Sequence, residues 1–344
     1  MPGPILLRCD GGGAYGVGHV MRQLALADEL SARGCTPQFV GTLQNVGWLS
    51  SMLADRRMSV LPLGPSAGEL VDLAVRIEAS AVVLDGYHLP SDTGSALRAA
   101  GIPVAAMVDY AFGTDQDADL YVDQNLGAEA DLFLPASRRP MGSSVLAGID
   151  YALFRDDVLA LRRDGPRAPG VPPTLLAVFG GTDAYSAAPV VVPAVLASGR
   201  PLVLTVVAAS AQIADQLRAL PLGRDQELRV VPPTPHVATL AAGSDLAISA
   251  AGSSVWEFLC LGTPTALVCV VDNQEDGYRR ATGMTVAAGL GHLDGFDPAA
   301  ASHTVAELLG SANALAELTR NGQALVDGKG RVRVVDALLR LSAG

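Results

Sequence analysis

The chain has 344 residues, enough for roughly two domains of about 150 residues each. Acidic residues outnumber basic ones by 35 to 24, and the net charge of −11 argues against nucleic acid or an anionic lipid surface as a partner. Hydrophobic residues make up 49% of the chain, which excludes a disordered protein. We expect no membrane span, no signal peptide and a cytoplasmic location, because the chain has neither a long apolar run nor a basic, then apolar, N-terminus.

Short β-branched runs alternate with amphipathic stretches along the first half of the chain. Apolar runs of four to eight residues are typical of buried strands, whereas apolar residues three and four apart indicate helices. We therefore predict strands at 5–8, 37–41, 81–86 and 103–109, and helices at 18–33, 67–79 and 91–100.

The alternation stops at residues 162–173, RRDGPRAPGVPP, and then resumes. Because this segment is charged and rich in Gly and Pro, no helix or strand should run through it, and we predict a linker. Two βαβα runs predict an α/β protein with two Rossmann-like, doubly wound parallel-sheet domains, 1–161 and 174–344. Ligands of such sheets bind at the carboxyl ends of strands, and with two domains most often in the cleft between them. The strands of the second domain are predicted at 174–179, 202–208, 227–231, 245–249 and 264–271.

The four cysteines form no CxxC pair, and no Cys/His cluster has the spacing of a zinc site. Cys260 and Cys269 lie in apolar stretches and are interpreted as buried thiols.

The first predicted strand runs into a glycine-rich loop, CDGGGAYGVGH, and then into a helix. Glycines such as Gly16 and Gly18 let the backbone approach a ligand, and the helix N-terminus favours an anion. The loop lacks the GK[ST] of a P-loop, and no acidic residue ends the second strand, so a nicotinamide cofactor is not expected. Asp10 opens this loop and is a candidate binding residue.

His19 lies at the start of that helix, where the positive helix end opposes imidazolium and favours a histidine that accepts a proton. Arg22 follows three residues later on the same helix face. The alternative is a histidine that only caps or packs the helix.

Three loops of the second half also follow predicted strands. Gly180, Gly181 and Thr182 would offer backbone N–H groups and a hydroxyl to a phosphate, although a plain turn with Asp183 as helix cap explains the same residues.

The next loop places Ala251, Gly252, Ser253 and Ser254 at a helix start, which suits a diphosphate bound without a metal. Glu257, one turn inside that helix, could accept hydrogen bonds from ribose hydroxyls; alternatively it only complements the helix dipole.

Asn273 and Gln274 follow the last predicted strand, and their amides suit a sugar, although a cap for the next helix is the simpler explanation.

The ordered motifs of the chain resemble the PseG/SpsG family, which comprises the UDP-sugar hydrolases of pseudaminic acid biosynthesis and related spore-coat polysaccharide proteins. The family shares the GT-B architecture of nucleotide-sugar glycosyltransferases. The matching residues are Gly16-x-Gly18-His19-x-x-Arg22, Asp85-Gly86-Tyr87, Val108-Asp109, Gly148-x-x-Tyr151-x-Leu153-x-Arg155, Gly180-Gly181-Thr182-Asp183, Ser249-Ala250-Ala251-Gly252 with Glu257, Asp272-Asn273-Gln274 and Asp327-Gly328-Lys329-Gly330.

The resemblance implies inverting hydrolysis of a UDP-linked amino sugar at its anomeric carbon, with no metal or other cofactor. It implies that His19 activates water and that Tyr87 and Asn273 lie near the sugar. It implies that UDP is held by Gly181, Thr182, Ser253, Ser254 and Glu257.

The sequence departs from the family at Tyr110, where a second Asp often follows Asp109. Residues 109–131 carry seven acids and no base, which indicates a solvated loop or, alternatively, a loop that selects a cationic or polyhydroxyl group. Two other functions stay open. A glycosyltransferase would use the same UDP site with His19 acting on a small-molecule acceptor, and a binding protein would hold the nucleotide sugar without turnover.

Overall fold

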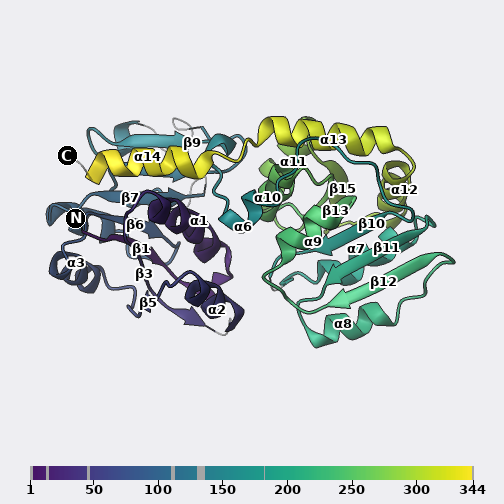
Figure 1. Ribbon diagram of the computed structural model, residues 1–344, viewed down its shortest axis with the longest axis horizontal. Helices are drawn as coiled ribbons and strands as arrows, with labels where there is room; N and C mark the ends of the chain where they lie inside the picture. Colours follow the sequence, from purple (N-terminus) through teal and green to yellow (C-terminus); the bar gives the residue numbers. More distant parts are fainter. Residues whose placement is uncertain are drawn as a thin grey trace. The chain divides into compact units, whose positions relative to one another are not determined.

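The computed structural model describes residues 3–12, 15–44, 47–109, 113–129, 136–181 and 183–342, which divide into two α/β units (Figure 1). The first unit comprises Met1–Asp156 and Gly328–Gly344, and the second comprises Asp157–Asp327. Among the described residues, no helix is both long and apolar enough to cross a membrane.

The first unit is built on a seven-stranded sheet in the order β5-β3-β1-β6-β7-β8-β9, in which every pair is parallel. The order reverses between β1 and β6, so the carboxyl ends of these two strands flank the switch point where α/β proteins bind ligands. The sheet strands are β1 (Ile5–Cys9), β3 (Pro37–Val40), β5 (Val60–Leu61), β6 (Ala81–Asp85), β7 (Val104–Val108), β8 (Leu120–Asp123) and β9 (Ser144–Ala147), and a separate pair is formed by β2 (Gly11–Gly12) and β4 (Leu43–Gln44).

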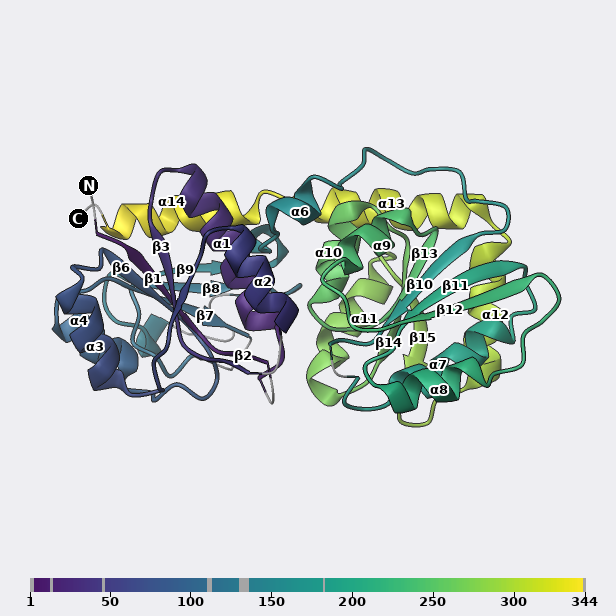
Figure 2. The same ribbon diagram turned by 60° about the horizontal axis from the view of Figure 1, so that its bottom comes forward.

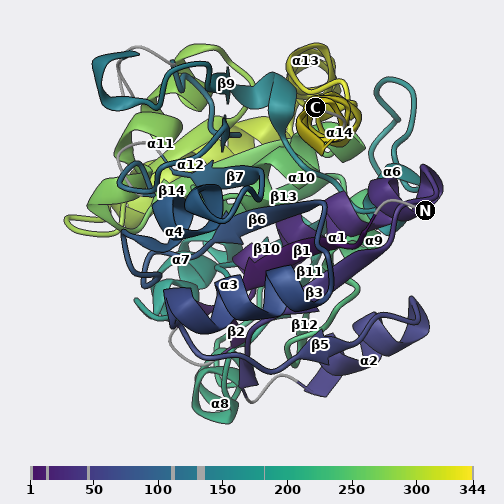
Figure 3. The same cartoon turned by 90° about the vertical axis from the view of Figure 1, so that its left-hand side faces the viewer.

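Helices cover both faces of this sheet because successive strand residues point to opposite sides (Figure 1, Figure 3). Residues 81 and 83 of β6 pack with α1 and α14, whereas residues 82 and 84 pack with α3 and α4. The helical segments are α1 (Gly18–Ala32), α2 (Gly47–Asp55), α3 (Ala67–Arg76), α4 (Thr93–Ala99), η2 (Ala136–Arg138), η3 (Ile149–Tyr151) and α14 (Gly330–Ser342).

The second unit contains a six-stranded parallel sheet in the order β12-β11-β10-β13-β14-β15, with its switch point between β10 and β13 (Figure 2). One face packs against α7, α8 and α12. The strands are β10 (Thr174–Val178), β11 (Leu202–Val207), β12 (Gln226–Val231), β13 (Leu246–Ala250), β14 (Thr265–Cys269) and β15 (Ala288–His292). The helical segments are α6 (Asp156–Leu159), α7 (Ala187–Leu196), α8 (Ala211–Arg218), α9 (Val237–Gly243), α10 (Ser254–Leu261), η4 (Asp272–Gln274), α11 (Glu275–Gly283), α12 (Pro298–Leu309) and α13 (Ala312–Leu325).

The predicted domain boundaries need two corrections. The segment 162–173 is not a free linker, because the Arg162 guanidinium donates to the carbonyls of Cys260 and Val326, both at 2.7 Å, and the segment belongs to the second unit. The C-terminal helix α14 belongs to the first unit, where Val335 and Leu338 are buried in the core beside α1. Burial of this apolar face explains why the chain returns to the first sheet.

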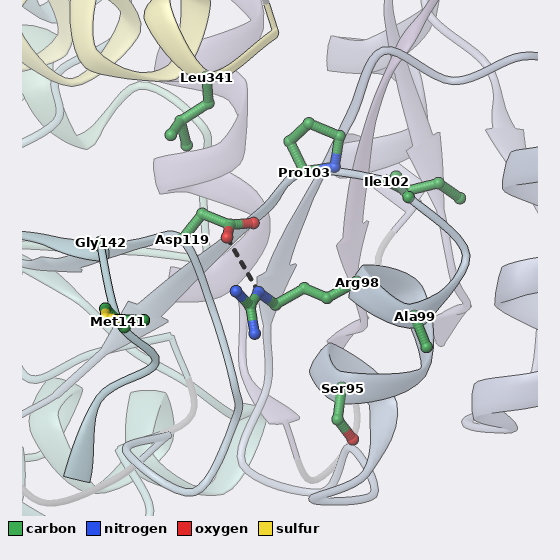
Figure 4. A pocket seen from close by; sticks show the side chains of 10 residues that line it. Ser95, Arg98, Ala99, Ile102, Pro103, Asp119, Met141, Gly142 and Leu341 are labelled. Carbon is green, nitrogen blue, oxygen red and sulfur yellow. Dashed lines mark hydrogen bonds and ion pairs between the residues drawn. The ribbon is translucent and has the colours of Figure 1, made fainter. Parts of the chain in front are cut away.

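The acidic segment 109–131 is not simply a solvated loop, because it contains the buried strand β8. Asp119, just before β8, is paired with Arg98 at 2.9 Å and also accepts from the Val104 backbone N–H. This pair lines a surface pocket of about 640 Å³ at the amino ends of β7 and β8, the edge opposite the switch point (Figure 4).

Candidate active site

The loop after β1 leads to His19 through an open stretch of backbone. Gly16 has a φ of +67°, a conformation that favours glycine, and a Cβ added to Gly16 or Gly18 would meet no described atom within 4 Å. His19 then falls in the first turn of α1, with 12% of its side chain exposed. The two glycines therefore have open surroundings among the described residues, and the imidazole that follows them is partly exposed.

His19 is paired with Asp85, the last residue of β6. Its Nδ1 atom lies 2.7 Å from Oδ1 of Asp85, whose side chain is fully buried. Burial alone would raise the pKa of Asp85, but the charge of Arg22 and the hydrogen bonds to the carboxylate hold it well below its usual value. Because an ionised carboxylate only accepts, the contact with Asp85 favours the tautomer with its proton on Nδ1, although an N–H of Arg22 also faces Nδ1 at 3.2 Å. In that tautomer Nε2 would be the acceptor that a general base needs.

Arg22 joins two aspartates at the carboxyl edge of the sheet. Its Nε donates to Oδ2 of Asp85 at 2.7 Å, and its Nη1 donates to Oδ1 of Asp109 at 3.0 Å. Gln23 adds a bond of 2.8 Å to Oδ2 of Asp85. Arg22 is buried, and burial would lower its pKa, but the charges of Asp109 and Asp85 raise it well above the usual value. Among the described residues its side chain contacts these two carboxylates and His19, and its contact with a ligand stays a prediction.

Strand alternation explains why both aspartates face α1. Residues 81 and 83 of β6, and residues 105 and 107 of β7, point toward α1. Because side chains alternate between the two faces of a strand, Asp85 and Asp109 point to the same face of the sheet as these residues. His19, Arg22 and Gln23 lie three and four residues apart and so share the helix face above them.

Tyr87 lies beside His19 and binds the second aspartate. Its hydroxyl donates to Oδ2 of Asp109, and its ring meets the imidazole edge-to-face with centroids 4.9 Å apart. Partial burial and the charge of Asp109 raise the pKa of Tyr87 far above its usual value, so the hydroxyl stays a donor. Asn125 donates to Oδ1 of the same carboxylate at 3.1 Å. Tyr87 is nevertheless 55% exposed, which leaves its ring accessible.

Asp10 belongs to a separate polar group at this edge. Its Oδ1 accepts from the backbone and hydroxyl of Thr42, and its Oδ2 contacts Arg8 and His88. The Tyr15 ring lies against His88 with centroids 4.3 Å apart. Asp10 is only 4% exposed, so its carboxylate positions the loop and His88 instead of presenting a free oxygen.

In the second unit, the predicted phosphate loops flank the switch point. Gly180 follows β10 with a φ of +82°, and Gly181 is exposed, whereas Thr182 lies outside the described residues. Asp183 is buried, and its carboxylate accepts from the backbone N–H groups of Ala187 and Ala188 at the start of α7. Asp183 thus bonds the first N–H groups of α7, although Ser186 is the residue at the N-cap position, and the phosphate role of this loop stays a prediction.

The loops after β13 and β14 meet at Gly252. A Cβ added there would lie 3.7 Å from Nε2 of Gln274, whose Oε1 accepts from the Val270 backbone at 3.2 Å. Ser253 and Ser254 are exposed at the start of α10, and Ala251 beside them is buried. Glu257 lies in the first turn of α10, and Asn273 is exposed on η4. One edge of this sheet thus presents small residues, hydroxyls and amides together.

The sequence interpretation missed Asp85 and Asp109 as site residues, although both are quoted in its motifs. The signal was available, because Asp85 and Asp109 lie at or next to the carboxyl ends of predicted strands, where ligands of parallel sheets bind. His88 was missed as well, and no local pattern marks it, since its partner Asp10 lies 78 residues away.

Comparison with known proteins leaves the family of the chain open. No family model matches the chain. No curated protein matches it.

Solved structures match the whole chain at low identity. The MurG of Acinetobacter baumannii has a TM-score of 0.68 at 18% identity, covering 98% of this chain and 99% of the other. A complex of Staphylococcus aureus MnaA with UDP gives 0.66 at 11% identity, covering 98% and 97%. Arabidopsis thaliana UGT89C1 with UDP-L-rhamnose gives 0.65 at 15% identity, covering 99% and 100%. Together with the two parallel-sheet units, these likenesses define the class: the chain has a GT-B fold.

Proposed function

We propose that the chain binds a UDP-linked sugar and hydrolyses it at the anomeric carbon, as the resemblance to the PseG/SpsG family implies. The observation that carries this proposal is the pair of His19 and Asp85 at the switch point of the first sheet, in which the carboxylate orients the imidazole. Support for UDP comes from the neighbours of the same fold, several of which are described as complexes with UDP or a UDP-sugar.

In this reaction His19 Nε2 takes a proton from water, and the oxygen attacks C1 of the sugar. The bond between C1 and the diphosphate oxygen breaks, UDP leaves with that oxygen, and the configuration at C1 inverts. Tyr87 and Asn273 would contact the sugar. The diphosphate would be held by Gly180, Gly181, Thr182, Gly252, Ser253 and Ser254, with Glu257 on the ribose and Gln274 beside the loop.

We also propose that no metal takes part in this step. Backbone N–H groups and hydroxyls at the start of α10 are donors that stabilise a leaving diphosphate directly. The net charge of −11 does not prevent binding, because these donors act locally.

The second candidate is a glycosyltransferase, in which an acceptor hydroxyl replaces water. Two exposed aromatic rings favour it, because Tyr87 is 55% and Tyr15 is 38% exposed at the edge that holds His19. Aromatic faces of this kind could stack against an apolar or cyclic acceptor.

The decisive experiment measures UDP release from a panel of UDP-sugars, with and without candidate acceptors such as nucleosides. We expect release with water alone, and a loss of about 10²–10⁴-fold in rate for His19→Asn with UDP affinity retained. If UDP is released only when an acceptor is added, the chain is a glycosyltransferase and the hydrolysis proposal is wrong. Tight UDP binding without release under any condition would indicate a binding protein.

A further inference from the structure

Three potential metal ligands converge in the second unit, at the ends of its last two strands and beside η4. They are Cys269 at the end of β14, Glu275 at the start of α11 and His292 at the end of β15. One donor atom from each lies within 4.8 Å of the other two. Cys269 and His292 are opposite one another on paired strands, at a register shift that follows Leu267.

The Glu275 carboxylate holds the other two side chains together. The Cys269 thiol donates to its Oε2 at 3.6 Å, and Nε2 of His292 lies 2.6 Å from the same oxygen. A cation at the centre of the three donors would displace the thiol proton to solvent and leave the imidazole proton on Nδ1. Thiolate, imidazole and carboxylate together are the ligand set of zinc, at bond lengths of about 2.0–2.3 Å.

The surroundings suit an open coordination site. Cys269 is buried, whereas the side chains of Glu275 and His292 are about half exposed, which leaves a fourth position to solvent. The His292 ring meets Tyr278 edge-to-face at 5.2 Å, and the Tyr278 hydroxyl accepts from the Gly291 backbone at 3.0 Å. The imidazole is therefore held in place by its neighbours.

A nucleophilic cysteine explains this cluster less well. Burial and the charge of Glu275 raise the pKa of Cys269 to about 11, so the thiol stays protonated near neutral pH. The neighbour of Sγ is a carboxylate, whose negative charge opposes a thiolate, and the imidazole contacts the same carboxylate oxygen.

We propose that Cys269, Glu275 and His292 form a site for one divalent transition-metal cation of the zinc type. The metal would join the ends of β14 and β15 to the start of α11, the helix that directly follows η4. The proposed site stands whether or not the chain hydrolyses a UDP-sugar, because none of its three ligands is assigned a part in that reaction.

The test is a titration of the full-length, metal-stripped protein with Co²⁺, followed by near-ultraviolet absorption. Coordination of a thiolate to Co²⁺ produces a charge-transfer band, which we expect to saturate at one equivalent and to disappear when Zn²⁺ is added. Cys269→Ser should abolish the band. The matched control, Cys35→Ser, changes the partly exposed cysteine of the first unit and should keep it.

A second pair of variants tests the imidazole. We expect His292→Ala to weaken Co²⁺ binding at least tenfold and to remove the rise in unfolding temperature that Zn²⁺ gives the unaltered protein. His303→Ala is the control, because His303 pairs with Glu307 at 3.2 Å on a helix without a neighbouring cysteine. Circular dichroism shows whether each variant folds. Absence of the band in the unaltered protein, or its survival in Cys269→Ser, would overturn the proposal.

Discussion

At the scale of single residues, the chemistry proposed for the first unit rests on one buried carboxylate. Asp85 is bonded to His19, Arg22 and Gln23, so its charge is matched by a buried guanidinium and its oxygens are satisfied. An unpaired charge at this depth would be strongly destabilising, so the pairing is required for the site to exist. The imidazole is oriented as a consequence.

Replacing Asp85 by Asn tests that orientation. The amide can donate to Nδ1 of His19, which would move the imidazole proton to Nε2 and block the base. We expect kcat for UDP release to fall by about 10²–10⁴-fold while the Kd for UDP is unchanged, as measured by steady-state kinetics and UDP titration.

The matched control for this variant is Asp119→Asn. Asp119 is another paired aspartate of the same sheet, at the opposite edge (Figure 4), and its loss should leave kcat unchanged. If Asp85→Asn folded normally and retained full activity, the pairing of His19 with Asp85 would have no role in catalysis.

For the second unit, the corresponding prediction concerns Glu257. Its carboxylate lies in the first turn of α10, beside the exposed Ser253 and Ser254. Glu257→Ala should raise KM for the UDP-sugar by about 5- to 30-fold, equivalent to losing one charge-assisted hydrogen bond, with a smaller change in kcat. Glu317→Ala, an exposed glutamate of α13, is the control for a loss of negative charge. An unchanged KM would contradict the ribose role.

At the scale of elements, the predicted strands of the first half were confirmed within one or two residues. Their apolar runs are continuous because both sheet faces are covered by helices. Prediction failed for β8, β9 and β15. The flanks of β8 are acidic, β9 is half exposed, and β15 contains two glycines, so none shows a continuous apolar run.

The helix α14 was assigned to the wrong unit, and its packing makes a stability prediction. Leu338 is 1% exposed in the core that it shares with α1. Leu338→Ala should lower the unfolding free energy of the first unit by about 2–5 kcal/mol. The two tryptophans separate the units, since Trp48 lies in α2 and Trp256 in α10.

This prediction is measured by denaturant unfolding of a Trp256→Phe background, in which Trp48 fluorescence reports on the first unit alone. Arg340→Ala, an exposed residue of the same helix, should leave the midpoint nearly unchanged. Equal effects of Leu338→Ala on the Trp48 signal in this background and on the Trp256 signal in a Trp48→Phe background would mean that the units do not unfold separately.

At the scale of the whole molecule, the chain crosses between units twice, at Asp156 and again at Asp327. Each unit has its own parallel sheet and its own switch point, and candidate residues collect at the carboxyl edge of each. The proposed base, His19, lies in the first unit, and the proposed ribose contact, Glu257, lies in the second. Variants at these two residues should therefore affect different kinetic constants.

The proposed reaction should also proceed without Mg²⁺. Protein dialysed against EDTA, then freed of it, should release UDP at the same rate whether or not Mg²⁺ is added back. A steady-state assay checks this, with a Mg²⁺-dependent glycosyltransferase as the positive control. A rate that depends on Mg²⁺ would mean that backbone and hydroxyl donors do not suffice for the diphosphate.

The sequence by itself determined the α/β class, the two alternating runs and the glycine-rich loops that follow strands. These features are local, because period, turn chemistry and helix starts are written in neighbouring residues. Only the tertiary structure decided the strand order, the return of α14 and the partners of the candidate histidine. His19 and Asp85 are 66 residues apart, and Cys269 and His292 meet only because β14 and β15 pair. Such contacts depend on the packing of the sheets, which no local pattern records.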